Sequence, residues 1–101
     1  MIEITNKEQF NEATANGKVL VKFSTPWCGP CRMLAENIMA VEPEVPEVKF
    51  YSVNVDEADE DFVNEFNIRN IPVLLVYENG ALKERKTGLV AVDELRKLCK
   101  P

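Results

Sequence analysis

The chain has 101 residues, of which 46% are hydrophobic and 29% are charged, which is typical of one globular domain spanning residues 1–101. Its formal net charge of −5 disfavours binding to nucleic-acid phosphates, and no apolar run approaches the length of a membrane span. We therefore expect no nucleic-acid partner and no membrane association.

The chain contains no histidine, which excludes Ser-His-Asp and Cys-His catalysis and imidazole metal ligands. Any catalysis must then rely on thiols or carboxylates. The three cysteines are too few for the disulfide framework of a small secreted scaffold, and residues 1–4 do not resemble a signal peptide. We expect a cytoplasmic protein, with an upstream leader as the alternative.

The N-terminal part of the chain predicts a strand, a helix and a second strand. Residues 2–4 predict a short strand, and Thr5 followed by Glu8 predicts a capping box that starts a helix. This helix is expected to run to about Asn16, where a glycine follows. Residues 19–23 are mostly β-branched or apolar, which indicates a strand buried on both faces, as in a parallel sheet.

The middle of the chain continues this alternation. Apolar side chains at helical spacing over residues 31–41 predict the second helix, and two prolines beyond it end it. Residues 48–55 predict the third strand. The acidic run over 56–61 suits a helix start, because carboxylates stabilise a helix N-terminus, and Phe62 and Phe66 are expected to anchor that helix.

The last third of the chain predicts a hairpin and a final helix. Residues 73–77 form a strand pattern, and Asn-Gly at 79–80 is a strong signal for a hairpin turn. Residues 82–87 form the returning strand, whose charges would protect a sheet edge. Gly88 ends this strand, and residues 92–99 predict an amphipathic helix. The order βαβαβαββα indicates an α/β fold, a central mixed β-sheet flanked by helices.

The most informative feature is the motif Trp27-Cys28-Gly29-Pro30-Cys31, between the buried strand and the second helix. Residues three apart on a first helical turn have Cβ atoms roughly 5–6 Å apart, close to disulfide geometry. The free amides and the dipole at a helix start also favour a thiolate, the attacking species in disulfide exchange. Cys28 and Cys31 are therefore predicted to be a redox-active dithiol, with Cys31 inward and Cys28 at the exposed tip.

With this pentapeptide, Ile71-Pro72 and Gly88 in this order of elements, the chain resembles the thioredoxin family over its whole length. The resemblance implies the thioredoxin fold and a thiol–disulfide oxidoreductase whose redox-active disulfide is Cys28–Cys31, with no bound cofactor. It also implies disulfide-containing client proteins and a thioredoxin reductase as partners. A monomer is the default expectation for the oligomeric state.

The resemblance also implies roles for the residues of the motif. Cys28 resembles the attacking thiolate of the family and Cys31 its resolving thiol, in agreement with the exposed and inward positions expected from the helical spacing. Gly29 and Pro30 would set the shape and stiffness of the turn between them.

Four residues resemble the substrate-binding positions of the family. Trp27 would pack beside the dithiol, and Pro72 would be a cis-proline facing the sulfurs. The backbone of Ile71 would pair with an extended substrate segment by β-augmentation. Gly88 would leave room for that same segment.

The chain departs from the family pattern at four positions. Lys22 stands where many relatives have a buried aspartate that helps to move the proton of the resolving thiol, and Ser52 stands where many have a nearby lysine. Ser24 replaces a second tryptophan, and Glu36 replaces a helix-kinking proline, so we expect a straighter helix. The usual acid–base device is absent, which affects kinetics more than reaction type.

Two interpretations of Lys22 stay open at this point. In the first, its stem packs in the sheet while its ammonium reaches the surface or pairs with a carboxylate such as Asp56. In the second, burial lowers the pKa of Lys22, and either its charged form favours the Cys31 thiolate or its neutral form accepts that thiol's proton. Cys99 shares a helical face with Leu95, which predicts a buried structural thiol rather than a regulatory one.

These observations favour a protein-disulfide reductase that works by dithiol–disulfide exchange. One alternative is a disulfide oxidase or isomerase on the same fold, with a less stable disulfide. A second is a binding or assembly subunit that uses the groove around Trp27, Ile71 and Gly88 without redox chemistry. A dimer tethered by a metal between CxxC pairs is a more distant alternative, and we expect no metal site.

Overall fold

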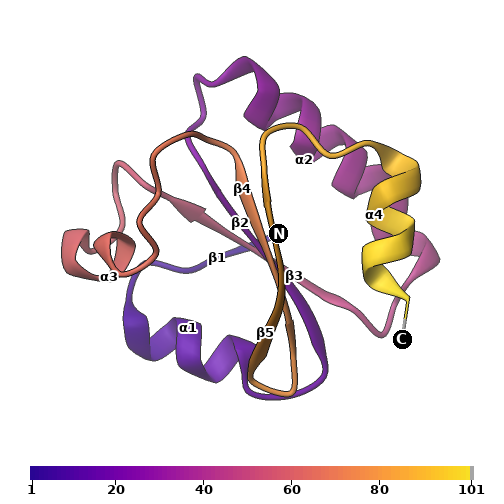
Figure 1. Ribbon diagram of the computed structural model, residues 1–101, viewed down its shortest axis with the longest axis horizontal. Coiled ribbons are helices and arrows are strands. Elements are labelled where there is room, and N and C mark those ends of the chain that lie inside the picture. Colours follow the sequence, from indigo (N-terminus) through magenta and orange to yellow (C-terminus); the bar gives the residue numbers. More distant parts are fainter. Residues whose placement is uncertain (101) are drawn as a thin grey trace.

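The computed structural model describes residues 1–100, which form a five-stranded mixed sheet with helices on both faces (Figure 1). The elements in chain order are β1 (Ile2–Glu3), α1 (Lys7–Thr14), β2 (Lys18–Ser24), α2 (Gly29–Val41), the short 3₁₀ helix η1 (Glu42–Glu44), β3 (Lys49–Asn54), α3 (Glu60–Asn64), β4 (Val73–Glu78), β5 (Ala81–Thr87) and α4 (Val92–Cys99). The predicted order of strands and helices is confirmed.

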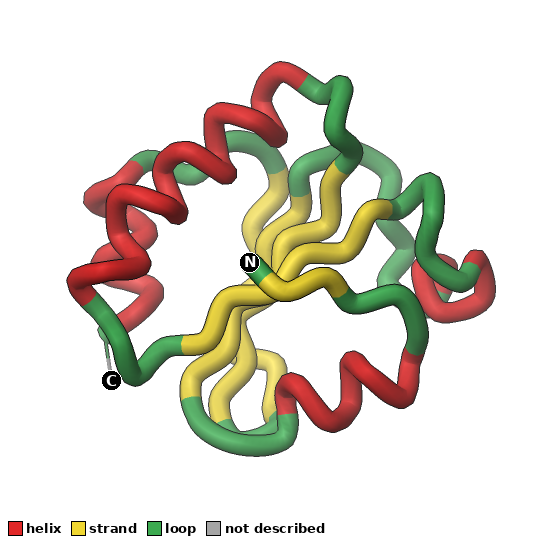
Figure 2. The backbone as a smooth tube through the Cα atoms, turned by 180° about the vertical axis from the view of Figure 1, so that it is seen from behind, coloured by secondary structure: helices red, strands yellow, loops and turns green. Residues whose placement is uncertain are grey.

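The sheet has the strand order β1-β3-β2-β4-β5. The strands β1, β3 and β2 run parallel, whereas β4 is antiparallel to β2 and β5 is antiparallel to β4. Figure 2 shows that α1 and α3 lie on one side of this sheet and α2 and α4 on the other. The parallel strands β2 and β3 therefore both end at the edge of the sheet where α2 begins.

The side chains of β2 alternate between the two faces, as a pleated strand requires. Val19, Val21 and Phe23 belong to the core under α1 and α3, whereas Leu20 belongs to the core under α2 and α4. All residues of β2 after Lys18 are buried, which confirms the prediction of a strand covered on both faces. The same alternation puts Lys22 on the α2 side of the sheet.

Aromatic side chains dominate the core between the sheet and the helices α1 and α3. Phe10 lies at the centre, with its ring 5.5 Å from that of Phe62, 5.0 Å from that of Phe66 and 5.3 Å from that of Tyr77. Phe23 of β2 adds a further ring, 5.0 Å from Phe66. These tilted and edge-to-face pairs stabilise the core beyond the burial of their area.

The start of α1 differs from the sequence prediction. The residue that caps the helix is Asn6 rather than Thr5, because the Asn6 side chain accepts a hydrogen bond from the backbone N–H of Gln9 at 2.9 Å. Gln9, not Glu8, then reaches back and accepts a hydrogen bond from the Thr5 N–H at 2.8 Å. Thr5 and Asn6 both have side chains that can cap a helix, so the sequence left the N-cap position uncertain by one residue. The helix also ends earlier, at Thr14.

The third helix is shorter than the aromatic pattern suggests. Its last residue is Asn64, so Phe66 packs into the core from the turn that follows the helix. Asn67 in this turn has a φ of 51°, and the Arg85 guanidinium donates hydrogen bonds to the carbonyl oxygens of Phe66 and Asn67. The prediction that Phe66 lies within the helix was therefore wrong, although its role in the core is confirmed.

The hairpin and the loop after it agree with the glycine pattern. Asn79 and Gly80 both have positive φ, 50° and 86°, as the predicted tight hairpin turn requires. Gly88, just after β5, has a φ of 91°, and its N–H donates a 2.7 Å hydrogen bond to the Pro72 carbonyl oxygen. The backbone at Gly88 thereby holds the segment that leads into β4.

We expect Phe10→Ala to lower the free energy of unfolding by about 3–5 kcal/mol, because it removes the ring at the centre of the aromatic core. Urea unfolding followed by circular dichroism measures this change. Met39→Ala is the matched control, since Met39 is 67% exposed, and should change stability by less than about 0.5 kcal/mol. Similar values for the two variants would contradict this account of the core.

Gly88→Ala should destabilise the fold by about 1–2 kcal/mol, because an L residue is strained at this positive φ. The cause is conformational, since nothing lies within 4 Å of an added Cβ. Gly29→Ala tests this distinction, because Gly29 has equal space but no positive φ, and it should be neutral or stabilising by up to about 1 kcal/mol. Equal effects in urea unfolding would show that φ is not the cause.

Candidate active site

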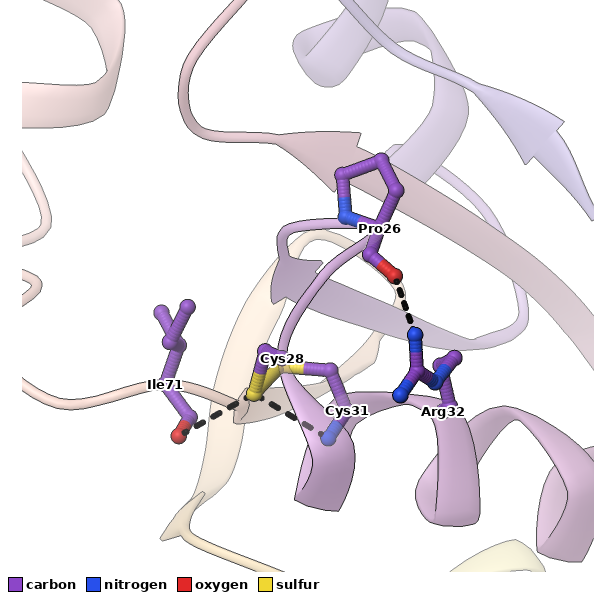
Figure 3. The surroundings of a disulfide bond; sticks show 5 residues. All are labelled: Pro26, Cys28, Cys31, Arg32 and Ile71. Carbon is purple, nitrogen blue, oxygen red and sulfur yellow. Dashed lines mark hydrogen bonds between the residues drawn. A yellow bond between two sulfur atoms is a disulfide. The ribbon is translucent and has the colours of Figure 1, made fainter.

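The two cysteines of the motif lie where β2 ends and α2 begins. Cys28 is the N-cap residue of α2, Pro30 lies in its first turn, and Cys31 follows within that turn. The Cα atoms of Cys28 and Cys31 are 5.1 Å apart, and their sulfur atoms form a disulfide (Figure 3). The spacing of the motif thus places the two thiols at bonding distance, as predicted.

Two backbone amides in the first turn of α2 donate to Cys28, one of them to its sulfur. The Cys31 N–H donates to the Sγ of Cys28 at 3.2 Å, and the Arg32 N–H donates to the carbonyl oxygen of Cys28 at 3.1 Å. The Arg32 guanidinium also donates to the carbonyl oxygen of Pro26, 3.4 Å away, and so joins the helix to the preceding loop (Figure 3). An amide that already faces the Cys28 sulfur stabilises negative charge there after reduction.

The two cysteines differ sharply in their exposure to solvent. Cys28 is half-buried, whereas Cys31 is only 1% exposed and continues the apolar stripe of α2 that contains Leu34, Ile38 and Val41. The inward position predicted for Cys31 is confirmed, and Cys28 is less exposed than a helix tip suggested. A large molecule can therefore reach only the sulfur of Cys28.

The loop before β4 faces the exposed sulfur. The Ile71–Pro72 peptide bond is cis, as the resemblance implied, and the carbonyl oxygen of Ile71 lies 3.9 Å from the Sγ of Cys28 (Figure 3). A disulfide sulfur carries no proton, so this approach becomes a hydrogen bond only when Cys28 is a thiol. Pro72 is buried and Ile71 is half-buried, and the carbonyl group of Ile71 lies beside the disulfide.

A surface hollow of about 470 Å³ extends from the disulfide, and Trp27, Cys28 and Ile71 contribute to its lining. Trp27 is 68% exposed, so most of its side chain faces solvent, and it lines this hollow together with Cys28. Val55 and Ile68 also line this hollow, and the sequence analysis did not identify them. Val55 comes directly after β3, and the parallel strands β2 and β3 end at the same edge of the sheet. This shared edge was the signal in the sequence pattern that could have placed Val55 near the cysteines.

Gly88 supports this site through the backbone of Pro72. Gly88 does not line the hollow, but its N–H donates a hydrogen bond to the Pro72 carbonyl oxygen. A Cβ at this position would meet no atom within 4 Å, and the room for a substrate segment at Gly88 stays a prediction.

A second cavity of about 270 Å³ lies on the other side of Cys31, and it brings Lys22 and Cys31 together. Lys22 is only 8% exposed, and burial lowers its pKa below the ordinary lysine value. Within residues 1–100, no carboxylate lies at ion-pair distance from it. The pairing with Asp56 suggested by the sequence is therefore absent, and Asp56 does not line this cavity.

Cys99 is a buried free thiol in α4. Burial raises its pKa, the charge of Lys18 lowers it, and the charge of Glu47 raises it. Lys18 is the first residue of β2, whereas the disulfide follows the last residue of that strand, so Cys99 lies at the opposite end of the sheet. The prediction of a buried thiol is confirmed, and its distance from the site excludes it from the dithiol chemistry.

Residues 1–100 contain neither a candidate metal site nor a candidate membrane-spanning helix. Across residues 1–100, no three His, Cys, Asp or Glu side chains are grouped so that they could hold a metal ion. No helix in the same range is long and apolar enough to cross a membrane. The dithiol is therefore the group in this part of the chain with recognisable chemistry.

The comparisons with known proteins agree with this geometry. The family model described as Thioredoxin matches residues 1–100. Thioredoxin of Chlamydia trachomatis is 34% identical over 98 residues, covering 97% of this chain and 95% of that protein, and thioredoxin of Mycoplasmoides gallisepticum is 34% identical over 101 residues, covering 99% and 100%. The solved structure of Plasmodium falciparum thioredoxin superposes with a TM-score of 0.84 at 27% identity, covering 98% and 96%. With its Cys28–Cys31 disulfide, the chain therefore belongs to the thioredoxin family and is a thiol–disulfide oxidoreductase.

Proposed function

We propose that this protein-disulfide reductase attacks its clients with Cys28 and releases them with Cys31. The observation that carries this assignment is the difference in exposure, since Cys28 is half-buried and Cys31 is 1% exposed. A client disulfide reaches the first sulfur alone, and the second sulfur is held beside it for an intramolecular step. An intramolecular attack is fast because the reacting groups are already in place.

The reaction consists of two exchange steps. The Cys28 thiolate attacks one sulfur of the client disulfide, so a Cys28–client bond forms and the other client sulfur leaves as a thiolate. Cys31 then loses its proton and attacks the Sγ of Cys28. The Cys28–client bond breaks, the second client sulfur leaves with the electron pair, and the Cys28–Cys31 disulfide remains. The client gains two electrons, and the protein loses two.

The surface around Cys28 suits an extended client segment. The hollow beside Trp27 provides room for apolar side chains, and the backbone of the half-buried Ile71, which lines this hollow, would provide a partner for main-chain hydrogen bonds. The cis peptide at Pro72, held by Gly88, keeps this backbone next to the sulfur. Gly29 and Pro30 shape the turn that joins the two cysteines.

A thioredoxin reductase would restore the dithiol after each cycle, and the cytoplasm would be the site of action. The name of the relatives, thioredoxin, supports this partner. The same surface would then serve both partners in turn, because each must reach the sulfur of Cys28.

The three cysteine variants test these roles. Cys28→Ser should abolish the acceleration of the reduction of a disulfide-bonded test protein by dithiothreitol, because the attacking sulfur is lost. Reduced Cys31→Ser, freed of dithiothreitol before the client is added, should instead accumulate a covalent Cys28–client adduct, visible by non-reducing electrophoresis and mass spectrometry. Cys99→Ser is the matched control and should keep full activity. An adduct on Cys31 in the Cys28→Ser variant would reverse the assignment.

The reduction potential of the Cys28–Cys31 pair separates the reductase from an oxidase or isomerase. A buried lysine beside Cys31 is the observation that favours the second class. We expect a potential below that of the glutathione couple, measured by equilibration in graded redox buffers with quantification of free thiols. A potential above that couple would assign the protein to the oxidases or isomerases. Activity that survives loss of both Cys28 and Cys31 would point to a binding subunit.

A further inference from the structure

One row of side chains crosses the sheet beneath the first turn of α2. Glu3 of β1 is level with Ser52 of β3, Ser52 is level with Lys22 of β2, and Lys22 is level with Leu74 of β4. Residues level with one another on neighbouring strands point to the same face of the sheet. Because Leu74 belongs to the core under α2 and α4, this row points toward α2. Its polar members, Glu3, Ser52 and Lys22, do not belong to that core and mark its boundary near the first turn of α2.

The cavity above this row is lined mostly by polar residues and lies against the buried thiol. Cys31 lines it together with Lys22, Ser52 and Thr25. The Oγ1 of Thr25 is buried and has no hydrogen-bond partner among residues 1–100. A buried hydroxyl normally has a partner, and a volume of about 270 Å³ is ample for water. The cavity is therefore suited to hydrate charge next to Cys31.

Three charged residues line this cavity, one from each of the elements β1, β2 and α2. Glu3 and Arg32 are exposed at its rim, whereas Lys22 is 8% exposed. Water screens charges at an exposed rim, and a buried charge acts through a lower effective dielectric constant. Of the three, Lys22 is therefore the least screened by bulk water, and its charge is positive.

We propose that Lys22 is a positioning residue for the resolving step: its ammonium, held in the cavity behind Cys31, stabilises the Cys31 thiolate that attacks the mixed disulfide. This inference rests on the proposed roles of the two cysteines. The proton of Cys31 leaves through the cavity to solvent, and the resulting thiolate forms the new bond to the Sγ of Cys28. The client sulfur leaves with the electron pair of the bond that breaks. Lys22 stays protonated throughout and makes no bond.

Burial of this lysine is unfavourable for folding, as the direction of its pKa indicates. Burial lowers the pKa of Lys22 in the folded protein below its unfolded value, so the folded state binds this proton less tightly. The resulting loss of stability is fully present below the folded pKa and is relieved as the pH rises through the window between the two pKa values. Lys22→Met removes this loss, so the variant should be at least as stable as the parent at neutral pH.

Lys22→Met tests the proposal, because it keeps the length of the side chain and removes the charge. In a Cys28→Ser background, where the two thiols no longer titrate together, the Cys31 thiol is followed by nuclear magnetic resonance of isotope-labelled cysteine Cβ. We expect its titration midpoint to rise by about one pH unit, a tenfold change. If Lys22→Met does not fold, Lys22→Gln is used for the same measurement.

The rate of the resolving step gives a second readout in protein that retains Cys28. A tenfold loss of thiolate is partly offset because a more basic thiolate is about threefold more nucleophilic. Release of a small thiol from a mixed disulfide on Cys28, followed by stopped flow, should therefore slow about three- to fourfold at neutral pH. Above both midpoints, where Cys31 is ionised in either protein, the order should reverse, because the more basic thiolate of Lys22→Met then reacts about threefold faster.

Two further variants complete the test. Lys49→Met removes an exposed charge at the other end of β3 and should leave the Cys31 midpoint unchanged, whereas Lys22→Arg should keep it near the parent value. An unchanged or lowered midpoint in Lys22→Met overturns the proposal. Slower resolution with an unchanged midpoint also overturns it, in favour of a neutral Lys22 acting as a base. None of these outcomes alters the assignment of Cys28 and Cys31, which depends on the adducts of the cysteine variants.

Discussion

The packing of one apolar stripe of α2 against the sheet determines the chemistry of this protein. Cys31 lies on that stripe with Leu34, Ile38 and Val41, and all four side chains are buried. Burying the stripe fixes the rotation of the helix about its axis, and this rotation places the preceding cap residue, Cys28, at the surface. One sulfur is thus presented to clients and the other is kept from them. The hydrophobic effect acts on residues that have no part in the chemistry, and it makes the two thiols unequal in their exposure to clients.

Local patterns in the sequence were sufficient to predict the elements and the dithiol. Each strand and helix has its own periodicity, and the Asn79-Gly80 turn and the start of α2 have residue preferences that act over a few positions. The errors also had local causes. Asn6 and Thr5 both have side chains that cap a helix, and Phe66 fits a helical pattern although it packs from a turn.

The features that the sequence did not predict all depend on long-range register. The resemblance implied that Ser52 lies near Lys22, but nothing near Glu3 in the chain indicates that it is level with both of them across β1, β3 and β2. Likewise, Val55 and Trp27 share a hollow only because β3 and β2 end at the same edge. Pairing of strands sets these neighbours, and pairing is decided by the whole core rather than by adjacent residues.

A buried ammonium at the position where the resemblance implied a carboxylate changes the conditions under which negative charge is favoured near Cys31. An anion in this position would oppose a thiolate and would have to take up its proton, whereas a cation attracts the thiolate and leaves the proton to water. Ser52, level with Lys22 on the neighbouring strand, is consistent with this exchange, because a second cation there would repel the first. The reaction itself needs only two sulfurs at bonding distance, so the charge behind them can change sign while the chemistry is retained.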